Sequence, residues 1–184
     1  MAEENQNEGN EGQSAEPIFT IDRLYTKDLS LEIPHAPEIF LEMGEPEVSI
    51  EFSVGSADLN DGYYQTVLTL TCQGKKSDGA SIFLIEVQQA GIANIQNQPA
   101  EAVEYLLRAT LPTVLYPFAY ETVTNMLLRA GLPPIQLPTA INFESLYAAY
   151  RRQQAEQEGQ AKGSEAEEEA KKSEAEEEAK KNAN

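Results

Sequence analysis

The stretch YYQTVLTLTCQGKKSDGASIFLIEVQQ, residues 63–89, reads as two β-strands joined by a turn. Residues 63–73 are rich in β-branched and aromatic types, which pleated strands favour. Residues 80–89 form a second, more apolar run, and GKKSDG at 74–79 consists of residues typical of tight turns. The stretch therefore predicts a β-hairpin. Because side chains alternate across a strand, one face of the first strand carries Thr66, Leu68, Leu70 and Cys72, and the other carries Val67, Thr69 and Thr71.

Two more strands are predicted upstream. In residues 48–54, apolar and polar side chains alternate strictly, which is the pattern of a strand with one buried face. Residues 19–25 alternate less cleanly. With the hairpin, these segments predict four strands, arranged antiparallel. The apolar face of the 48–54 strand consists of Val48, Ile50, Phe52 and Val54.

After residue 98 the apolar residues recur with the period of a helix. A first helix is predicted from Pro99 and is ended by Pro112, because a proline removes a helical hydrogen bond. A second helix is predicted from Pro117 to Ala130, with Gly131 as its stop. Strands followed by helices indicate an α+β domain. Residues 132–141 contain three prolines and are predicted to be irregular, and a short third helix is predicted after Asn142 as N-cap, with Phe143, Leu146, Tyr147 and Tyr150 as its apolar stripe.

The segment LPTVLYPFAY, residues 111–120, is unusually apolar for a connection between two helices. A connection is normally hydrated and polar. This segment therefore either closes over the core or lines an apolar groove, and the sequence favours neither alternative.

Composition divides the 184 residues into three parts. Residues 1–16 and 155–184 contain no apolar residue larger than alanine after Met1, so they cannot repay the entropy of folding by burial. They are predicted to be acidic, charged tails around one domain at 17–154. The C-terminal tail repeats SEAEEEAKK at 164–172 and 173–181, a pattern that favours a fraying helix.

The formal net charge of −18 makes nucleic acids and acidic membrane surfaces unfavourable partners. The first sixteen residues lack the positive and apolar regions of a secretory signal, and no apolar run is long enough to span a membrane. One cysteine, Cys72, fits a reducing compartment. We therefore expect a cytoplasmic protein without direct membrane insertion.

Catalytic and cofactor motifs are scarce. With one histidine and one cysteine, the chain has neither HExxH nor a zinc-finger set, and it contains no phosphate-binding glycine loop. His35 lies between two prolines in a predicted exposed turn, and Cys72 is expected to be a small buried residue. We expect no enzyme activity, metal or cofactor. A small hydrolase that uses His35 or a carboxylate pair is the less favoured alternative.

Four blocks of sequence resemble SecB, the bacterial protein-export chaperone family. Their order and spacing cover nearly all of residues 17–154, which makes the resemblance far more specific than any single motif. The blocks are LYTKDLSLEIPHAPEIF at 24–40, FLIEVQQAGI at 83–92, VLYPFAYETVTNMLLRAG at 114–131 and INFESLYAAY at 141–150.

The resemblance implies an ATP-independent holdase. Such a protein binds unfolded precursor proteins in an apolar groove, keeps them competent for export and delivers them to the translocation motor SecA. It also implies a homotetramer, built as a dimer of dimers from a four-stranded antiparallel sheet followed by two main helices and a short C-terminal helix.

The resemblance also implies site residues, which are the positions of this chain that match the family's site positions. The implied SecA-docking surface is acidic, the implied assembly positions lie on the opposite face of one strand, and the implied client groove is apolar. The docking residues are Asp28, Glu32, Leu84 and Glu86; the assembly residues are Ile85, Val87 and Gln89; and the groove residues are Ile50, Phe52, Leu115, Tyr116 and Phe118. Core packing is an equally good reading of each groove residue.

Three positions depart from the family pattern and leave the groove's polarity and shape open. Tyr120 stands where an arginine is common, Ala90 replaces a glycine, and Gly44 falls where some members carry a tryptophan. Two alternative functions remain at this point. One is a chaperone dedicated to a toxin-antitoxin system, and the other is an acidic oligomeric adaptor that docks a folded partner.

Overall fold

The computed structural model describes residues 16–42 and 44–157. The chain divides into two compact units, Met1–Phe143 and Glu144–Asn184, and each is described by itself. The SEAEEEAKK repeat and most of both predicted tails lie outside the described residues. None of the described helices is both long and apolar enough to cross a membrane.

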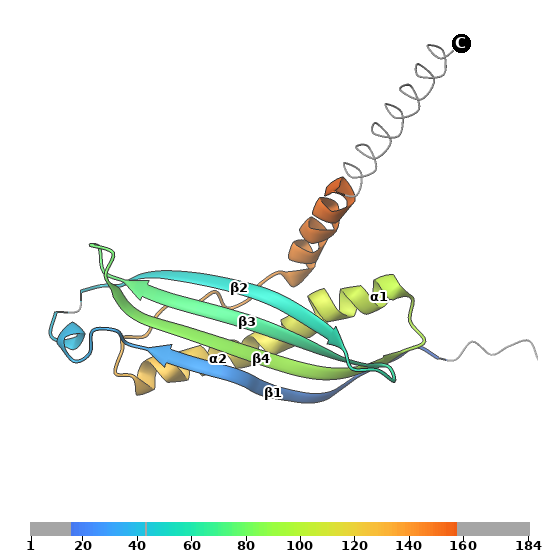
Figure 1. The fold of residues 1–184 in the computed structure, drawn as a ribbon, viewed down its shortest axis with the longest axis horizontal. Coiled ribbons are helices and arrows are strands. Elements are labelled where there is room, and N and C mark those ends of the chain that lie inside the picture. The colour runs from blue at the N-terminus through green and yellow to red at the C-terminus, as the bar shows by residue number, and fades with distance from the viewer. Residues whose placement is uncertain (1–15, 43, 158–184) are drawn as a thin grey trace, which may run out of the picture. The chain divides into compact units, whose positions relative to one another are not determined.

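Four strands form one sheet (Figure 1). They are β1 (Ile18–Glu32), β2 (Glu47–Asp58), β3 (Tyr63–Lys75) and β4 (Ser81–Gln96). Their order is β1-β4-β3-β2, and every neighbouring pair is antiparallel. The α+β class and the four-stranded antiparallel sheet are therefore confirmed, although the strands are longer than the sequence alternation indicated.

The prediction of two helices separated by a loop is wrong. Residues 100–129 form one helical run that consists of α1 (Ala100–Tyr105), a π-helical turn (Leu106–Thr110) and α2 (Leu111–Arg129). Pro112 lies in the first turn of α2 and Pro117 lies inside that helix. The apolar segment 111–120 is thus helical.

The π-helical turn explains how the chain passes Pro112. The Leu111 amide donates to the carbonyl of Leu106, five residues earlier. Continuing that pattern would require the amide of residue 112 to reach Leu107, but proline has no amide hydrogen. The Leu107 carbonyl instead accepts a hydrogen bond from the buried Thr66 hydroxyl of β3, at 3.2 Å. A partner on the sheet thereby replaces the missing helical donor.

The helical run covers one face of the sheet, as Figure 1 shows for α2 behind the strands. The core lies between them, because alternate residues of β3 and β4 are buried on that face. The opposite face, here called the open face, carries the intervening residues, which are half-buried or exposed apart from the buried Ala90 and Ile82. The buried residues of β3 and β4 on the covered face include Thr66, Leu68, Leu70, Cys72, Phe83, Ile85, Val87, Ala93 and Ile95.

Residues 131–142, here called the crossover segment, contain no helix or strand, which confirms the prediction for this proline-rich stretch. Gly131 has a φ of +71° and ends the helical run as predicted. Leu132 and Leu137 are buried and attach the segment to the core. A C-terminal helix covers 143–157 and begins directly after Asn142, also as predicted.

The second unit is described only as part of that C-terminal helix. Within it the Arg151 side chain donates to the Tyr147 hydroxyl at 3.4 Å and lies 6.0 Å from the centre of the same ring. These residues are four apart, so they are neighbours on the helix surface.

Candidate functional site

Four aromatic rings connect the sheet, the crossover segment and α2. Phe52 of β2 packs edge-on against Phe143, with ring centres 5.9 Å apart. Phe143 packs edge-on against Tyr116 of α2 at 6.2 Å, and Tyr116 lies 6.4 Å from Tyr120. The Tyr116 hydroxyl donates a hydrogen bond to the carbonyl of Pro138 in the crossover segment. Burial, reinforced by Tyr120, raises the pKa of Tyr116 above its ordinary value, so this hydroxyl keeps its proton at neutral pH.

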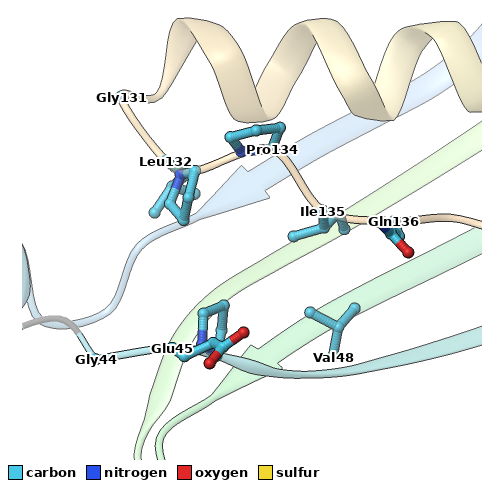
Figure 2. A pocket seen from close by; sticks show the side chains of 10 residues that line it. Gly44, Glu45, Val48, Gly131, Leu132, Pro134, Ile135 and Gln136 are labelled. Atoms are coloured by element: carbon cyan, nitrogen blue, oxygen red, sulfur yellow. The ribbon is translucent and has the colours of Figure 1, made fainter.

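A pocket of about 860 Å³ lies beside β2, the strand that contributes Phe52 to the aromatic cluster (Figure 2). One wall is the start of the crossover segment, and the other is the chain that leads into β2. Glu45 is the one charged residue among the lining side chains, and three of the others are prolines. The complete lining is Gly44, Glu45, Pro46, Val48, Gly131, Leu132, Pro133, Pro134, Ile135 and Gln136.

The sequence did not predict this pocket, although its proline-rich composition was a signal. Val48 lies in it, and Ile50 and Phe52 follow on the same face of β2, because they are two and four residues further along the strand. Ile50 packs against the core while half-buried, and Phe52 is 37% exposed. The pocket therefore continues into an accessible apolar strip on β2.

The structure places the five predicted groove residues in three environments. Ile50 and Phe52 lie on the apolar strip, and Tyr116 lies behind it in the aromatic cluster. Leu115 is fully buried in the core, so it does not line an accessible groove. Phe118 is 45% exposed, although it lies one helical turn after the buried Leu115 on α2. Burial therefore differs among the three predicted groove residues of α2, from the fully buried Leu115 to the partly exposed Phe118.

The four predicted docking residues lie together on the open face of the sheet. Glu32 of β1 is directly opposite Leu84 of β4, and Ser30 is opposite Glu86. Asp28 is opposite Gln88, two positions further along. Directly opposite residues of an antiparallel pair share a face, so the exposed Asp28 and Glu32 of β1 and the half-buried Glu86 of β4 form one acidic group on the open face.

The side chains of the predicted assembly residues lie on the covered face of the sheet, opposite the docking residues. Ile85 and Val87 are fully buried beneath the helical run, and Gln89 is 3% exposed. The side-chain oxygen of Gln89 accepts a hydrogen bond from the Thr26 hydroxyl at 3.2 Å. These side chains belong to the protomer's own core, so any influence on assembly would act through the position of β4 rather than by direct contact.

Cys72 has the buried position that its strand pattern predicted. It is 0% exposed, and burial raises its pKa from 9.0 to about 11. His35 lies exposed in a turn, also as predicted. No group of three or more metal-ligating side chains of the usual types occurs among residues 16–42 and 44–157.

We expect Cys72 to react with a thiol reagent at pH 8 at least about 100-fold more slowly in the native protein than in urea, because only the thiolate is nucleophilic and its fraction falls tenfold per pKa unit. The raised pKa also means that the contribution of this thiol to stability is complete below pH 9 and declines as the pH rises towards 11. Labelling rates with and without urea measure the first effect. Equal rates would contradict the buried position.

Comparison with known proteins agrees with this architecture. Residues 12–155 match the family described as preprotein translocase subunit SecB. The chain belongs to the SecB family. A SecB protein-export protein of Neisseria meningitidis serogroup C is 47% identical over 152 residues, which cover 83% of this chain and 99% of that protein. The corresponding SecB protein of Methylobacillus flagellatus is 46% identical over 147 residues, covering 80% of this chain and 92% of the relative.

A solved structure shares the SecB fold at low sequence identity. It is the Mycobacterium tuberculosis Rv1957 SecB-like chaperone in complex with a ChAD peptide from the Rv1956 HigA1 antitoxin. The TM-score is 0.55 at 16% identity, and the match covers 67% of this chain and 91% of that chain. SecB is a family of protein-export chaperones and not a family of enzymes.

Proposed function

We propose that this SecB-family protein is an ATP-independent holdase of the cytoplasm, which binds unfolded precursor proteins and keeps them competent for export. The supporting observation is the pocket that continues from Val48 along the apolar strip of Ile50 and Phe52. An unfolded chain exposes apolar side chains that such a surface can bury. A folded protein does not offer them, so the surface distinguishes the two states.

The edge of the sheet adds a second means of binding. β2 is the last strand in the order β1-β4-β3-β2, so one side of its backbone has no neighbouring strand among the described residues. An extended client segment can pair with such an edge through main-chain hydrogen bonds, which do not depend on sequence. Its alternate side chains would then lie beside Ile50 and Phe52.

We propose that the acidic group of Asp28, Glu32 and Glu86, with Leu84, docks SecA for delivery of the client. The support is that the four side chains share the open face of the sheet on two adjacent strands, where Asp28 and Glu32 are exposed and Leu84 and Glu86 are half-buried. Carboxylates on a surface attract a cationic partner and increase its association rate, and the effect declines with salt. The open face is separate from the client strip, so client and motor can bind together.

The homotetramer implied by the family is part of the proposal. Several grooves on one assembly would raise the effective concentration of binding sites for a long client, so weak contacts could hold it. Ile85, Val87 and Gln89 would support assembly by fixing β4 within each protomer.

Size-exclusion chromatography with light scattering tests the holdase proposal. Four chains of 20.3 kDa predict a species of about 81 kDa. A slow-folding polypeptide diluted from denaturant should co-elute with this species, whereas the folded form of the same polypeptide should not. A monomer, or binding that ignores the folding state of the client, would favour the acidic adaptor instead.

A chaperone dedicated to a toxin-antitoxin system is the second candidate, because the structural neighbour described above is bound to an antitoxin peptide. It receives less support, since the relatives at 46–47% identity are protein-export proteins, whereas that neighbour is 16% identical. Competition between an antitoxin peptide and an export precursor would separate the two.

A further inference from the structure

The turn between β2 and β3 contains an aspartate directly before a glycine. Asn60, Asp61 and Gly62 have positive φ angles of +71°, +53° and +79°. The Leu59 amide donates to the Tyr63 carbonyl at 2.8 Å, and the Tyr63 amide donates to the Asn60 carbonyl at 2.9 Å. Asp61, between these bonds, is exposed. The turn is therefore held at its ends and open to solvent at its centre.

The fold requires the glycine at position 62. Its φ of +79° lies in the left-handed region, where a residue with a side chain is strained. A Cβ added to Gly62 would also lie 2.8 Å from the Cγ atom of Gln96. As a result, no side chain shields the amide nitrogen that follows Asp61.

A second aspartate–glycine pair, Asp78 and Gly79, lies in the turn between β3 and β4 and serves as a comparison. Asp78 is also exposed. Its carboxylate accepts a hydrogen bond from the Ala80 amide at 2.9 Å, and the Gly79 amide donates to the Lys76 carbonyl at 2.9 Å. In the described part of the chain, the corresponding carboxylate and amide of the Asp61 turn make no such bonds. The two pairs therefore differ in how firmly their reacting groups are held.

We propose that the folded turn makes Asp61, and not Asp78, a site of spontaneous isomerisation to isoaspartate. The Gly62 nitrogen attacks Cγ of the protonated Asp61 carboxyl group, and a C–N bond forms as the C–O bond to the hydroxyl breaks. The amide proton and this hydroxyl leave as one water molecule, and a five-membered succinimide remains. A second water molecule opens the ring at the main-chain carbonyl carbon of Asp61, so the chain then passes through Cβ.

The contacts of the two turns explain the selection. Attack requires the aspartate side chain and the following peptide plane to rotate towards each other. At Asp78 two hydrogen bonds must break first, whereas at Asp61 none of these bonds is present. Isomerisation also releases Asp61 from a left-handed conformation, which costs free energy in a residue other than glycine.

The modification goes beyond the proposed chaperone function and has a defined structural result. It adds one carbon to the main chain of the turn that joins β2 to β3. β2 is the edge strand that carries the apolar strip, so copies of the protein that have aged differ from new copies next to this strand.

Peptide mapping of the full-length protein tests the site. Native protein and protein in urea are kept at mildly acidic pH and physiological temperature for several weeks, and electron-transfer fragmentation then quantifies isoaspartate at both pairs. In the native protein, Asp61 should isomerise about tenfold faster than Asp78, because only Asp78 must lose two hydrogen bonds. In urea, which unfolds both turns, the two rates should agree within about twofold.

Three results would overturn the proposal. Equal rates in the native protein would mean that the hydrogen bonds do not select the site. Isoaspartate that forms at Asp61 in urea but not in the native protein would mean that the folded turn protects this residue. A tenfold difference that persists in urea would mean that the local sequence, and not the fold, selects Asp61. The holdase proposal is tested separately by client binding and is independent of these results.

Discussion

Phe143→Ala is expected to lower the free energy of unfolding by about 3–5 kcal/mol, the usual cost of removing a buried phenylalanine ring. Phe143 is 2% exposed and packs against both Phe52 and Tyr116. Its loss would leave a cavity where the crossover segment, β2 and α2 meet. Urea unfolding measures the effect.

The same variant is expected to bind unfolded client more weakly, because Phe52 would lose the ring that fixes its orientation on the apolar strip. Phe118→Ala is the matched control, since it also removes a phenylalanine but from a position that is 45% exposed. Its unfolding free energy should change by no more than about 0.5 kcal/mol. Equal destabilisation by the two variants would show that Phe143 has no special structural position.

Thr66→Val is expected to cost about 1–3 kcal/mol, although the two side chains have nearly the same shape. The substitution removes the hydroxyl that donates to the Leu107 carbonyl and leaves that buried acceptor without a partner. Thr66→Ser, which keeps the hydroxyl, should cost less. Urea unfolding of the three proteins gives the comparison.

A double-mutant cycle with Pro112→Ala tests whether the Thr66 hydroxyl replaces the helical donor that Pro112 lacks. An alanine supplies the amide that proline lacks, and this amide can donate to Leu107 in the pattern that Leu111 begins. The cost of Thr66→Val should therefore be smaller, by about 1 kcal/mol, when residue 112 is alanine. A cost that is identical in both backgrounds would mean that the hydroxyl does not compensate for the proline.

The strands could be predicted because the residues that specify each strand are close together in the sequence. Alternation in residues 48–54 and the β-branched composition of 63–73 specify both the element and its buried face. The passage of the helix through Pro112 could not be predicted in this way. The group that satisfies the Leu107 carbonyl is Thr66, which is 41 residues away in the sequence.

The candidate sites also include features that the sequence could predict and features that it could not. The acidic residues of β1 and β4 could be placed on one face, opposite the assembly residues, from alternation and the family resemblance together. The pocket could not be found, because its walls come from residues 44–48 and 131–136, which only the folded chain brings together. The family resemblance assigns both Leu115 and Phe118 to the groove, whereas in the structure Leu115 is fully buried in the core and Phe118, one helical turn further along α2, is 45% exposed.

Beyond Leu132, the crossover segment is fixed by side-chain packing and by a hydrogen bond that a side chain of α2 donates to its main chain. Within the described part of the chain, no main-chain amide of residues 133–141 donates to another main-chain group. The segment is attached by the buried Leu137 and by the Tyr116 hydroxyl on Pro138. Its amides should exchange with deuterium rapidly even while the core strands remain protected. This wall of the pocket can therefore change shape without breaking a ladder of backbone hydrogen bonds, which would lower the energetic cost of binding the differently shaped clients of the proposed holdase.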